Sequence, residues 1–446
     1  MIGERVEISA RLKVISDLRI GAANEEAEEK NGETRHYSPV LRGVNGLPVL
    51  PASSLKGVLR AVLPEDIRDE AFGCITDHGS GRGQIGRLWL EQSFLISASQ
   101  DDLSGLSQDQ DDTGCFRKMG VALDPDRGTA SDNKLFTREF VAKGAEFGFH
   151  AVWFGGITDE AWQQVLANLV AGISIGGGTT SGAGRIILDL AHLSLTEHAL
   201  DEEGWLEATK CTKDKTREIV RSINERADSL APTRGGYRLT LTCEGPYISM
   251  LGPREDGNRK YVAPLERDGK PLLWPESLKG ALRSRARWLA EIQRLNADAG
   301  QIPRDAALPM DDPGLEHVLE GQKKLSGLAD RNRLSCVERL FGVTGLRGRL
   351  QVHDVACQHS GGTHDITGVN IDRITGGGRD QLLFRYRVFW NVRFTASLTI
   401  PDAASEDEHA LLETLLEDLR QNGLSLGHGA AKGFGWFEVQ VEEMAA

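Results

Sequence analysis

The opening residues of the chain alternate between apolar and polar side chains. Within residues 5–20, every second position is apolar at Val6, Ile8, Ala10, Leu12 and Val14. This period of two predicts a half-buried β-strand. The acidic stretch 21–36 that follows is too polar for a core and is predicted to be a loop. The pattern then predicts a helix after Pro51, strands over Gly86–Leu90 and Phe147–Phe154, and a helix over Asp159–Ala171.

The motifs of the first half return in the same order in a second half, which opens with a predicted strand at Tyr237–Cys243. Pro51–Arg60 returns as Pro275–Arg283, Phe72-Gly73 as Phe341-Gly342, Gly86–Leu90 as Gly348–Val352, and Gly172–Ile186 as Gly423–Trp436. An ordered set of repeated motifs predicts a tandem duplication. We therefore expect a first domain over 1–197, a charged helical linker over 198–233, and a second domain over 234–446.

Each repeated helix start combines a proline, serine hydroxyls and a lysine. The Pro-x-Ser order predicts a serine N-cap. A helix N-terminus that carries hydroxyls and a cation is also suited to binding phosphate. The alternative is an ordinary amphipathic helix with a lysine on its surface. The residues concerned are Ser53, Ser54, Lys56 and Arg60 in the first copy and Ser277, Lys279 and Arg283 in the second.

Each half closes on a glycine-rich segment of the form G-x-S-x-G-x-G-x-x-[S/K]-G-x-G. Glycines let backbone N–H groups approach a phosphodiester chain without obstruction by side chains. The alternative is a tight turn between a helix and a final strand. The segment is not a P-loop, because no Gly-Lys-Ser/Thr follows, and it lacks the helix that a dinucleotide fingerprint requires.

Composition describes a globular chain of 446 residues with a formal net charge of −13. That charge argues against nucleic acid as a partner. Much of the acid, however, lies in the blocks 25–33, 101–112 and 402–408, so the total does not decide the matter. There is no apolar run of about 18 residues and no signal-peptide core, so we expect a cytoplasmic protein with no membrane partner. The six cysteines include no CxxC pair.

Taken together, these motifs resemble the RAMP superfamily, and more narrowly the backbone subunits of type III CRISPR effector complexes, here as a fused tandem pair. The resemblance covers nearly the whole chain apart from the linker and the acidic loops. It implies an α+β fold of two tandem ferredoxin-like, RRM-type domains, with β-hairpin thumbs at about 120–140 and 368–388. It also implies an antiviral complex in which such subunits grip guide RNA (crRNA) beside other effector subunits, while the thumbs interrupt the guide–target RNA duplex.

Carried over by position, the resemblance assigns guide-RNA contacts to the two helix starts and to both glycine-rich loops. The loop residues so assigned are Gly176, Gly177, Gly178 and Ser181 in the first half and Gly427, His428, Gly429 and Lys432 in the second. Small residues and hydroxyls at these positions suit contacts to an RNA backbone that do not depend on base sequence.

Target-cutting members of the family carry an aspartate just before an x-Pro pair, where this chain has Tyr37 and Val262. Neither side chain can bind a divalent ion as a carboxylate does. We therefore expect a subunit that does not cleave and needs no cofactor. The alternative is an endoribonuclease, cutting target or processing guide, in which Glu33 and His36 act, with a divalent metal only in that case. A third reading is an interaction module of similar fold that holds no RNA.

His353, Cys357 and His359 have the side-chain types of zinc ligands. They lack a recognised spacing of ligand pairs and have no counterpart in the first half. The alternatives are a structural zinc site and ordinary loop residues.

Overall fold

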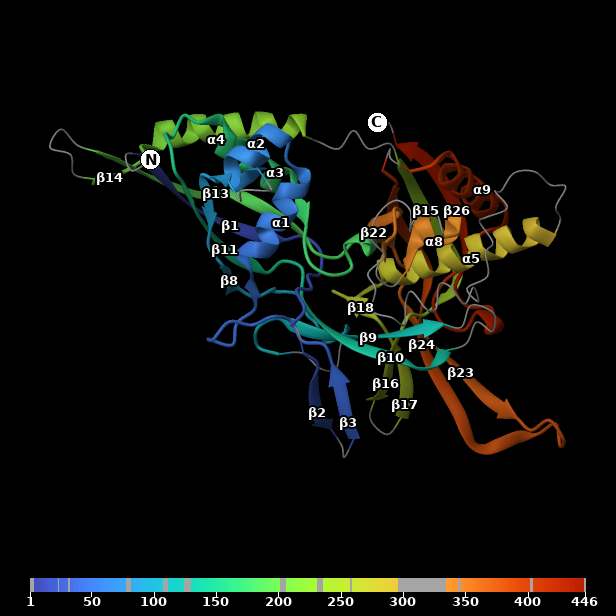
Figure 1. Cartoon of the computed structure of the whole chain (residues 1–446). Helices are drawn as coiled ribbons and strands as arrows, with labels where there is room; N and C mark the ends of the chain where they lie inside the picture. The colour runs from blue at the N-terminus through green and yellow to red at the C-terminus, as the bar shows by residue number, and fades with distance from the viewer. Residues whose placement is uncertain are drawn as a thin grey trace. The chain divides into compact units, whose positions relative to one another are not determined.

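The computed structural model describes residues 4–22, 24–30, 33–77, 82–106, 111–123, 130–200, 206–230, 236–256, 259–295, 334–343, 346–401 and 404–444. The chain divides into two compact units (Figure 1). The first comprises residues 1–103, 107–179 and 183–233. The second comprises residues 234–446 and takes in the short segments 104–106 and 180–182.

The first unit is built on an antiparallel sheet with helices on one face (Figure 1). Its core elements are β1 (Arg5–Val14), α1 (Ala52–Val62), α2 (Glu65–Phe72), β7 (Leu88–Leu90), β8 (Ser93–Ser97), β11 (Glu146–Trp153), α3 (Glu160–Ala171) and β13 (Arg185–Leu200). The strand order is β13-β1-β11-β8, with β7 also paired to β11. Shorter elements are β4 (Val49–Leu50), β5 (Gly73–Asp77), β6 (Arg82–Ile85), β12 (Ile173–Ser174), η1 (Thr179–Ser181) and β14 (Leu206–Lys210).

The second unit repeats this plan. Its core elements are β15 (Gly236–Tyr247), α5 (Pro275–Leu295), α8 (Cys336–Phe341), β22 (Gln351–His359), β24 (Gly378–Thr399), α9 (Glu406–Asn422) and β26 (Trp436–Met444). The strand order is β26-β15-β24-β22, and all three pairings are antiparallel. Shorter elements are β18 (Glu266–Arg267), β19 (Lys270–Pro271), β20 (Gly342–Val343), β21 (Leu346–Arg347), β25 (Leu424–Ser425) and η3 (Ala430–Lys432).

Both units therefore have the ferredoxin-like order in which the fourth strand lies beside the first, the first beside the third, and the third beside the second. The fold predicted from the sequence is confirmed. In β1 every second residue is buried, as the alternation predicts, and these side chains join the core that α3 covers with Trp162, Val165 and Leu169.

The stretch predicted as a helical linker contains helix α4 (Lys213–Ser229). Ile219, Ile223 and Ala227 on this helix are buried in the core of the first unit, and α4 packs on α3. The structure thus groups residues up to 233 with the first unit.

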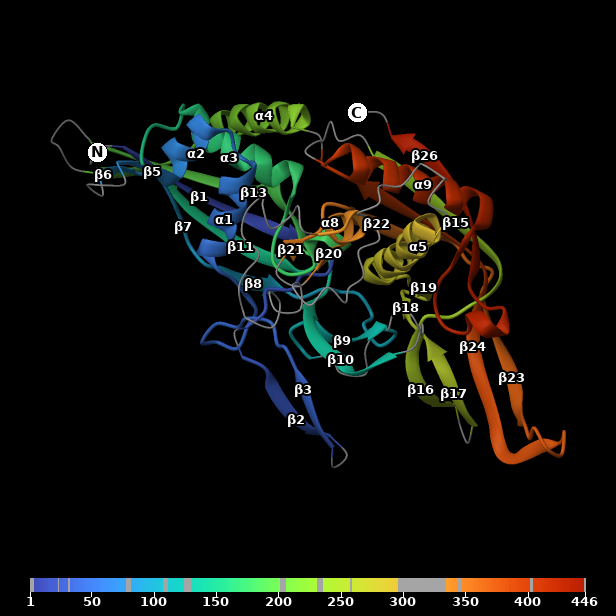
Figure 2. The ribbon, with the colours of Figure 1, turned by 45° about the vertical axis from the view of Figure 1, so that its right-hand side comes forward.

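Two β-hairpins recur in both units, besides other paired strands (Figure 2). The arms expected near 120–140 and 368–388 are β9 (Cys115–Leu123) with β10 (Ala130–Val141), and β23 (Thr363–Ile371) with β24. A further hairpin lies between the first strand and first helix: β2 (Glu26–Lys30) with β3 (Glu33–Tyr37), and β16 (Met250–Asp256) with β17 (Arg259–Pro264). The prediction of a loop over 21–36 is therefore wrong, because exposed hairpin strands need no apolar face.

Two repeated glycines explain why Phe-Gly and Gly-Arg-Leu recur. Gly73 and Gly342 end α2 and α8 with positive φ angles of 77° and 93°, which glycine adopts without strain. A Cβ on Gly86 would lie 2.4 Å from the carbonyl carbon of Phe72, and a Cβ on Gly348 would lie 2.3 Å from that of Phe341. The chain therefore passes back against its own helix end at a distance that side chains would prevent.

Arg87 follows Gly86, and Arg349 follows Gly348. Each arginine links the start of the second core strand (β7 or β22) to the second core helix, which is the helix after the third core strand (α3 or α9). Arg87 donates to Glu70, to the Phe154 carbonyl oxygen at 2.7 Å, and to Asp159, the residue that precedes α3. Arg349 donates to Glu408 in the first turn of α9 at 2.7 Å. Glu408 has no exposed side chain surface and also accepts from Arg339.

Glu408→Ala removes the carboxylate that pairs with Arg339 and Arg349, so that their positive charges are no longer compensated at a buried site. We therefore expect the free energy of unfolding to fall by about 3–5 kcal/mol. Glu417→Ala on the same helix is the matched control, because Glu417 pairs with Arg420 near solvent; its expected cost is below about 1 kcal/mol. Chemical denaturation of the purified variants measures both. Equal losses for the two variants would contradict this role for Glu408.

Candidate nucleic-acid interface

The first helix start exposes several of the residues assigned to RNA. Helix α1 begins at Ala52, with Pro51 in the N-cap position and no side-chain cap hydrogen bond. The prediction of a serine N-cap is therefore wrong, because Ser53 and Ser54 lie inside the first turn. Lys56 is exposed, with its ammonium group 5.6 Å from the centre of the Phe72 ring. Arg60 is half-buried and donates to the carbonyl oxygen of Gly73 at 3.0 Å, at the end of α2.

The second helix start differs in what it exposes. Helix α5 begins at Pro275, and Ser277 in its first turn is exposed. Lys279, in contrast, is buried and donates to the carbonyl oxygen of Leu350 at 2.9 Å. Burial, followed by the charges of Arg347 and Arg283, lowers the pKa of Lys279 to about 8. Burial likewise lowers the pKa of Arg283. The two lysines predicted to be equivalent thus differ, one facing solvent and one holding a backbone carbonyl.

The two glycine-rich loops have matching backbones. Positive φ angles recur at Gly176, Gly178, Gly182 and Gly184 in the first loop and at Gly427, Gly429, Gly433 and Gly435 in the second. The position after Gly176 is Gly177 in the first loop and His428 in the second, and neither needs a positive φ. In the first unit, strand β12, which leads into the loop, lies beside α1. The structure therefore places the strand that precedes the loop beside α1 in the first unit.

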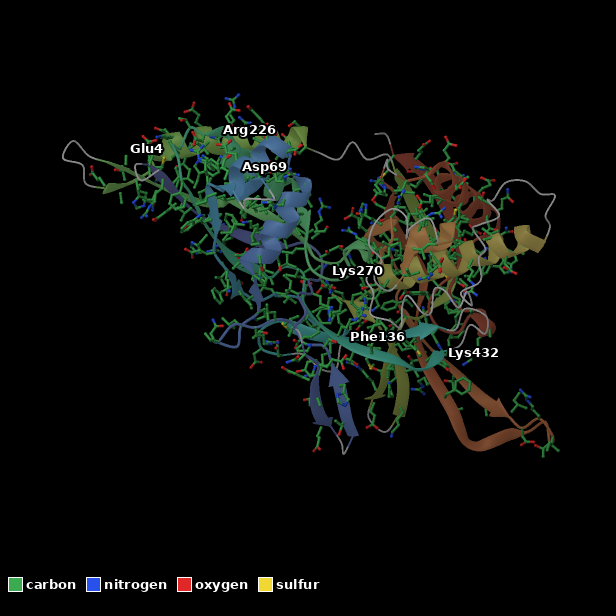
Figure 3. The ribbon with its side chains drawn as sticks, viewed as in Figure 1. Glu4, Asp69, Phe136, Arg226, Lys270 and Lys432 are labelled. Carbon is green, nitrogen blue, oxygen red and sulfur yellow. The ribbon has the colours of Figure 1, made fainter. Side chains whose placement is uncertain are left out.

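In the second unit the loop contacts the root of the arm. The Lys432 ammonium group donates to the Tyr386 hydroxyl at 2.8 Å and lies 4.6 Å from the centre of the Phe384 ring. The His428 ring lies 6.0 Å from that of Tyr386. Burial and the charge of Lys432 lower the pKa of His428. Figure 3 labels Lys432 beside this hairpin.

Both arms carry the same two cross-strand pairs. Gly120 lies opposite Phe136 and Gly368 opposite Phe384, and a Cβ on either glycine would overlap the facing ring at 2.3 and 2.4 Å. The neighbouring pairs are Val121 with Leu135 and Val369 with Leu383. These four apolar side chains are all exposed, between 43% and 69%. Each arm therefore presents an aromatic ring over a glycine at one pair and exposed aliphatic side chains at the next.

The position at which the resemblance implies an aspartate is occupied by a tyrosine in each unit. Arg138 and Tyr386 each lie two residues after the phenylalanine that faces the arm glycine. Arg138 forms a parallel β-bridge with Ser38, and Tyr386 forms one with Val262. Val262 is thus equivalent to Ser38, and the residue equivalent to Tyr37 is Tyr261. The sequence assignment to Val262 is off by one residue, because matching the two prolines hides a difference in register.

Both tyrosines are covered by an arginine from the arm. The Arg117 guanidinium lies 3.7 Å from the centre of the Tyr37 ring, and that of Arg387 lies 4.2 Å from the centre of Tyr261. The Tyr37 hydroxyl donates to Glu26 at 2.6 Å. Burial, followed by this hydrogen bond, raises the pKa of Tyr37.

The alternative catalytic residues lie on β3, not in a loop. His36 is exposed there and pairs with Ala27, while Glu33 pairs with Lys30 near the turn of the hairpin. The catalytic role of Glu33 and His36 stays a prediction.

The zinc candidate does not assemble. Among the described residues, no group of three or more His, Cys, Asp or Glu side chains could hold a metal ion. The His353 ring bonds Asp354 at 2.7 Å, and the Cys357 thiol donates to the His359 carbonyl oxygen at 3.3 Å.

Sequence reasoning missed several residues that lie beside the candidate interface. Arg19 and Arg138 lie near the first loop and arm, and Tyr386 contacts Lys432. No repeated motif contains them, because the two halves differ at these positions. The helix caps at Ser335 and Ser405, in contrast, carry the Ser-x-x-Glu signature of a capping box and were readable from the sequence. Within the described residues, no helix combines the length and apolar character needed to cross a bilayer.

Known proteins match the chain in sequence and in structure. A chain of a cryo-EM structure titled "Type III-B Cmr-beta" in the apo state matches with a TM-score of 0.32 and 14% identity, over 41% of this chain and 96% of that one. A protein of Enterococcus italicus named "CRISPR system Cms endoribonuclease Csm3" is 26% identical over 204 residues, which cover 41% of this chain and 88% of that protein. The RAMP superfamily model matches residues 11–187 and again residues 228–438. The chain therefore belongs to the RAMP superfamily and contains two repeats of its domain.

Proposed function

We propose that this chain is a guide RNA (crRNA)-binding backbone subunit of a type III CRISPR effector complex in antiviral defence. Its partners are the guide, the target RNA and other effector subunits in the cytoplasm. The observation that carries the proposal is the recurrence, in two ferredoxin-like units, of one glycine-rich loop and one hairpin arm at equivalent places. Each unit then occupies one repeat position along the guide. The similarity to a protein named as part of a CRISPR system supports this role.

The glycine-rich loops supply the backbone surface for the guide. The exposed glycines Gly176, Gly178 and Gly427 let N–H groups reach phosphates without steric obstruction. Lys56, Ser53, Ser277 and Lys432 add exposed donors at the helix starts and the second loop. Lys279 joins them only after it gives up its hydrogen bond to Leu350. Contacts of this kind position RNA without reading its sequence.

The arms supply the contact to the guide–target duplex. Exposed aliphatic side chains that stand on a rigid hairpin act as wedges between base steps in nucleic-acid complexes. Val121 with Leu135 and Val369 with Leu383 are such pairs. We propose that they enter the duplex where the two strands are interrupted.

The position that would hold a catalytic aspartate favours binding without cleavage. Tyr37 and Tyr261 have no carboxylate, and each ring is occupied by an arginine. A divalent ion therefore lacks its usual oxygen ligand there. The endoribonuclease alternative remains a candidate because the Enterococcus italicus relative is named an endoribonuclease and because His36 is exposed on β3.

The first test is the RNA that purifies with the protein. Expressed together with its native locus, the chain is expected to retain short RNAs of uniform length that share a repeat-derived end. Sequencing of the bound RNA measures this. A preparation without RNA, or one with random fragments that are lost in moderate salt, would overturn the proposal.

A glycine substitution tests the first loop. Gly176→Ala places a Cβ 2.2 Å from the Arg19 carbonyl oxygen at a φ of +86°, so the loop must move at a cost of about 1–3 kcal/mol. Gly148→Ala on β11 is the matched control, because its φ is not positive and its Cβ would lie no closer than 3.7 Å to the side chains around it. We expect the first variant to lose RNA affinity at least about tenfold and the second to keep it. Equal affinities would remove the loop from the binding surface.

Cleavage is tested with a complementary target. The wild-type complex is expected to bind labelled target RNA and leave it intact in the presence of Mg²⁺. Glu33→Ala and His36→Ala are expected to change neither result. Cleavage by the wild type that either substitution abolishes would establish the endoribonuclease alternative instead.

A further inference from the structure

A cation lies over the arm phenylalanine in both units, but a different element supplies it. In the first unit the Arg138 guanidinium, from the arm strand β10, lies 4.3 Å from the centre of the Phe136 ring. In the second unit the Lys432 ammonium group, from the glycine-rich loop, lies 4.6 Å from the centre of the Phe384 ring. Phe136 and Phe384 are equivalent, since each faces the arm glycine.

The loop hydrogen bonds fix which residues correspond. Gly177 donates to the Arg19 carbonyl oxygen at 2.8 Å, and His428 donates to that of Ile248 at 2.8 Å. Gly184 donates to Asp17, and Gly435 donates to Pro246, two residues earlier in each case. Arg19 therefore corresponds to Ile248, and Gly177 corresponds to His428. By the same register, Ser181 corresponds to Lys432, and the pairing within the arms relates Arg138 to Tyr386.

Basic side chains have thus exchanged positions between the halves. Where the first unit has Arg138 and Arg19 on the arm and on the turn after β1, the second has Tyr386 and Ile248. Where the second has Lys432 and His428 on the loop, the first has Ser181 and Gly177. Each unit keeps two basic residues at the junction of loop and arm, although none of the four positions is basic in both.

The first pair is held at an electrostatic cost. The Nε of Arg19 is buried and has no hydrogen-bond partner among the described residues. Burial and the charge of Arg138 both lower the pKa of Arg19. Two cations held close together beside glycine N–H groups are favoured by an anion that binds both. The Lys432 ammonium group is likewise held in place by Tyr386 while its residue stays exposed.

We propose that the junction of loop and arm in each unit is a phosphate-binding subsite, formed by Arg19 and Arg138 in the first unit and by Lys432 and His428 in the second. The inference rests on the proposed function, because the anion is a phosphate of bound RNA. It adds Arg19 and Arg138 as binding residues and Tyr386 and Phe384 as the residues that position Lys432. The subsite anchors the RNA backbone at the root of each arm.

Relocating the charge within the second unit tests the proposal. The probe is a fluorescein-labelled oligouridylate long enough to span both units, and affinity is measured by anisotropy at several salt concentrations. Lys432→Ser is expected to weaken binding about tenfold and to reduce the salt slope by about 0.7, the value for one phosphate contact with a single strand. Adding Tyr386→Arg to this variant recreates the arrangement of Arg138 over Phe136 and is expected to restore both values.

Two further variants complete the design. Lys260→Ser removes the same charge from the hairpin β16–β17, where Lys260 pairs with Glu255 at 3.3 Å, and is expected to leave affinity unchanged. Arg138→Tyr is expected to weaken binding about as much as Lys432→Ser. Restored affinity in the double variant would show that the arm is intact in Lys432→Ser and that the lost charge caused the weaker binding.

The outcomes separate this inference from the proposed function. If the wild-type chain binds no RNA, the proposed function fails. If it binds RNA and Lys432→Ser binds as tightly with an unchanged salt slope, the subsite is overturned while RNA binding stands. If the double variant binds no better than Lys432→Ser, the equivalence of the two cation positions is overturned.

Discussion

In each unit one ion pair joins the second core strand to the second core helix, and the arm and the glycine-rich loop both extend from these two elements. Arg87 and Arg349 stand at the start of the second core strand and reach acids at the start of the second core helix, Asp159 and Glu408. The arm emerges between the second and third strands, and the glycine-rich loop follows the second helix. Both therefore leave the core from elements that this arginine fixes. The acid is fully buried in the second unit and half-buried in the first. Removal of one partner of a buried pair is costly because it leaves the other charge uncompensated.

Much of the fold could be read from the sequence because its signals are local. The alternation of β1, the glycine at each helix end and the ordered return of the motifs each have a direct physical cause. The hairpin β2–β3 escaped because its strands have no apolar face, so periodicity carries no signal there. The helix start at Ser53 was misread because Pro-x-Ser fits a serine at the cap and a serine inside the first turn equally well.

The interface was less predictable because it depends on register between distant segments. Lys56 and Lys279 share a motif, yet one is exposed and the other is bonded to a backbone carbonyl. Arg19 and Arg138 share no motif with the second half, and only the loop hydrogen bonds reveal what replaced them. Two duplicated units can therefore keep a positive charge at the same place in the fold although no aligned position is basic in both. Reasoning from one sequence compares aligned positions and misses such a charge.

The two arms also differ in how they join their sheets. In the first unit the arm strand β10 ends at Val141, and the turn containing Gly144 separates it from β11. In the second unit β24 runs unbroken for 22 residues from the arm into the centre of the sheet, with the positive-φ residue Asn391 along it. We therefore expect a displacement of the first arm to be absorbed at the turn, and a displacement of the second arm to reach the central strand. The second arm is thus continuous with a core strand, whereas the first arm is joined to its core strand through a turn.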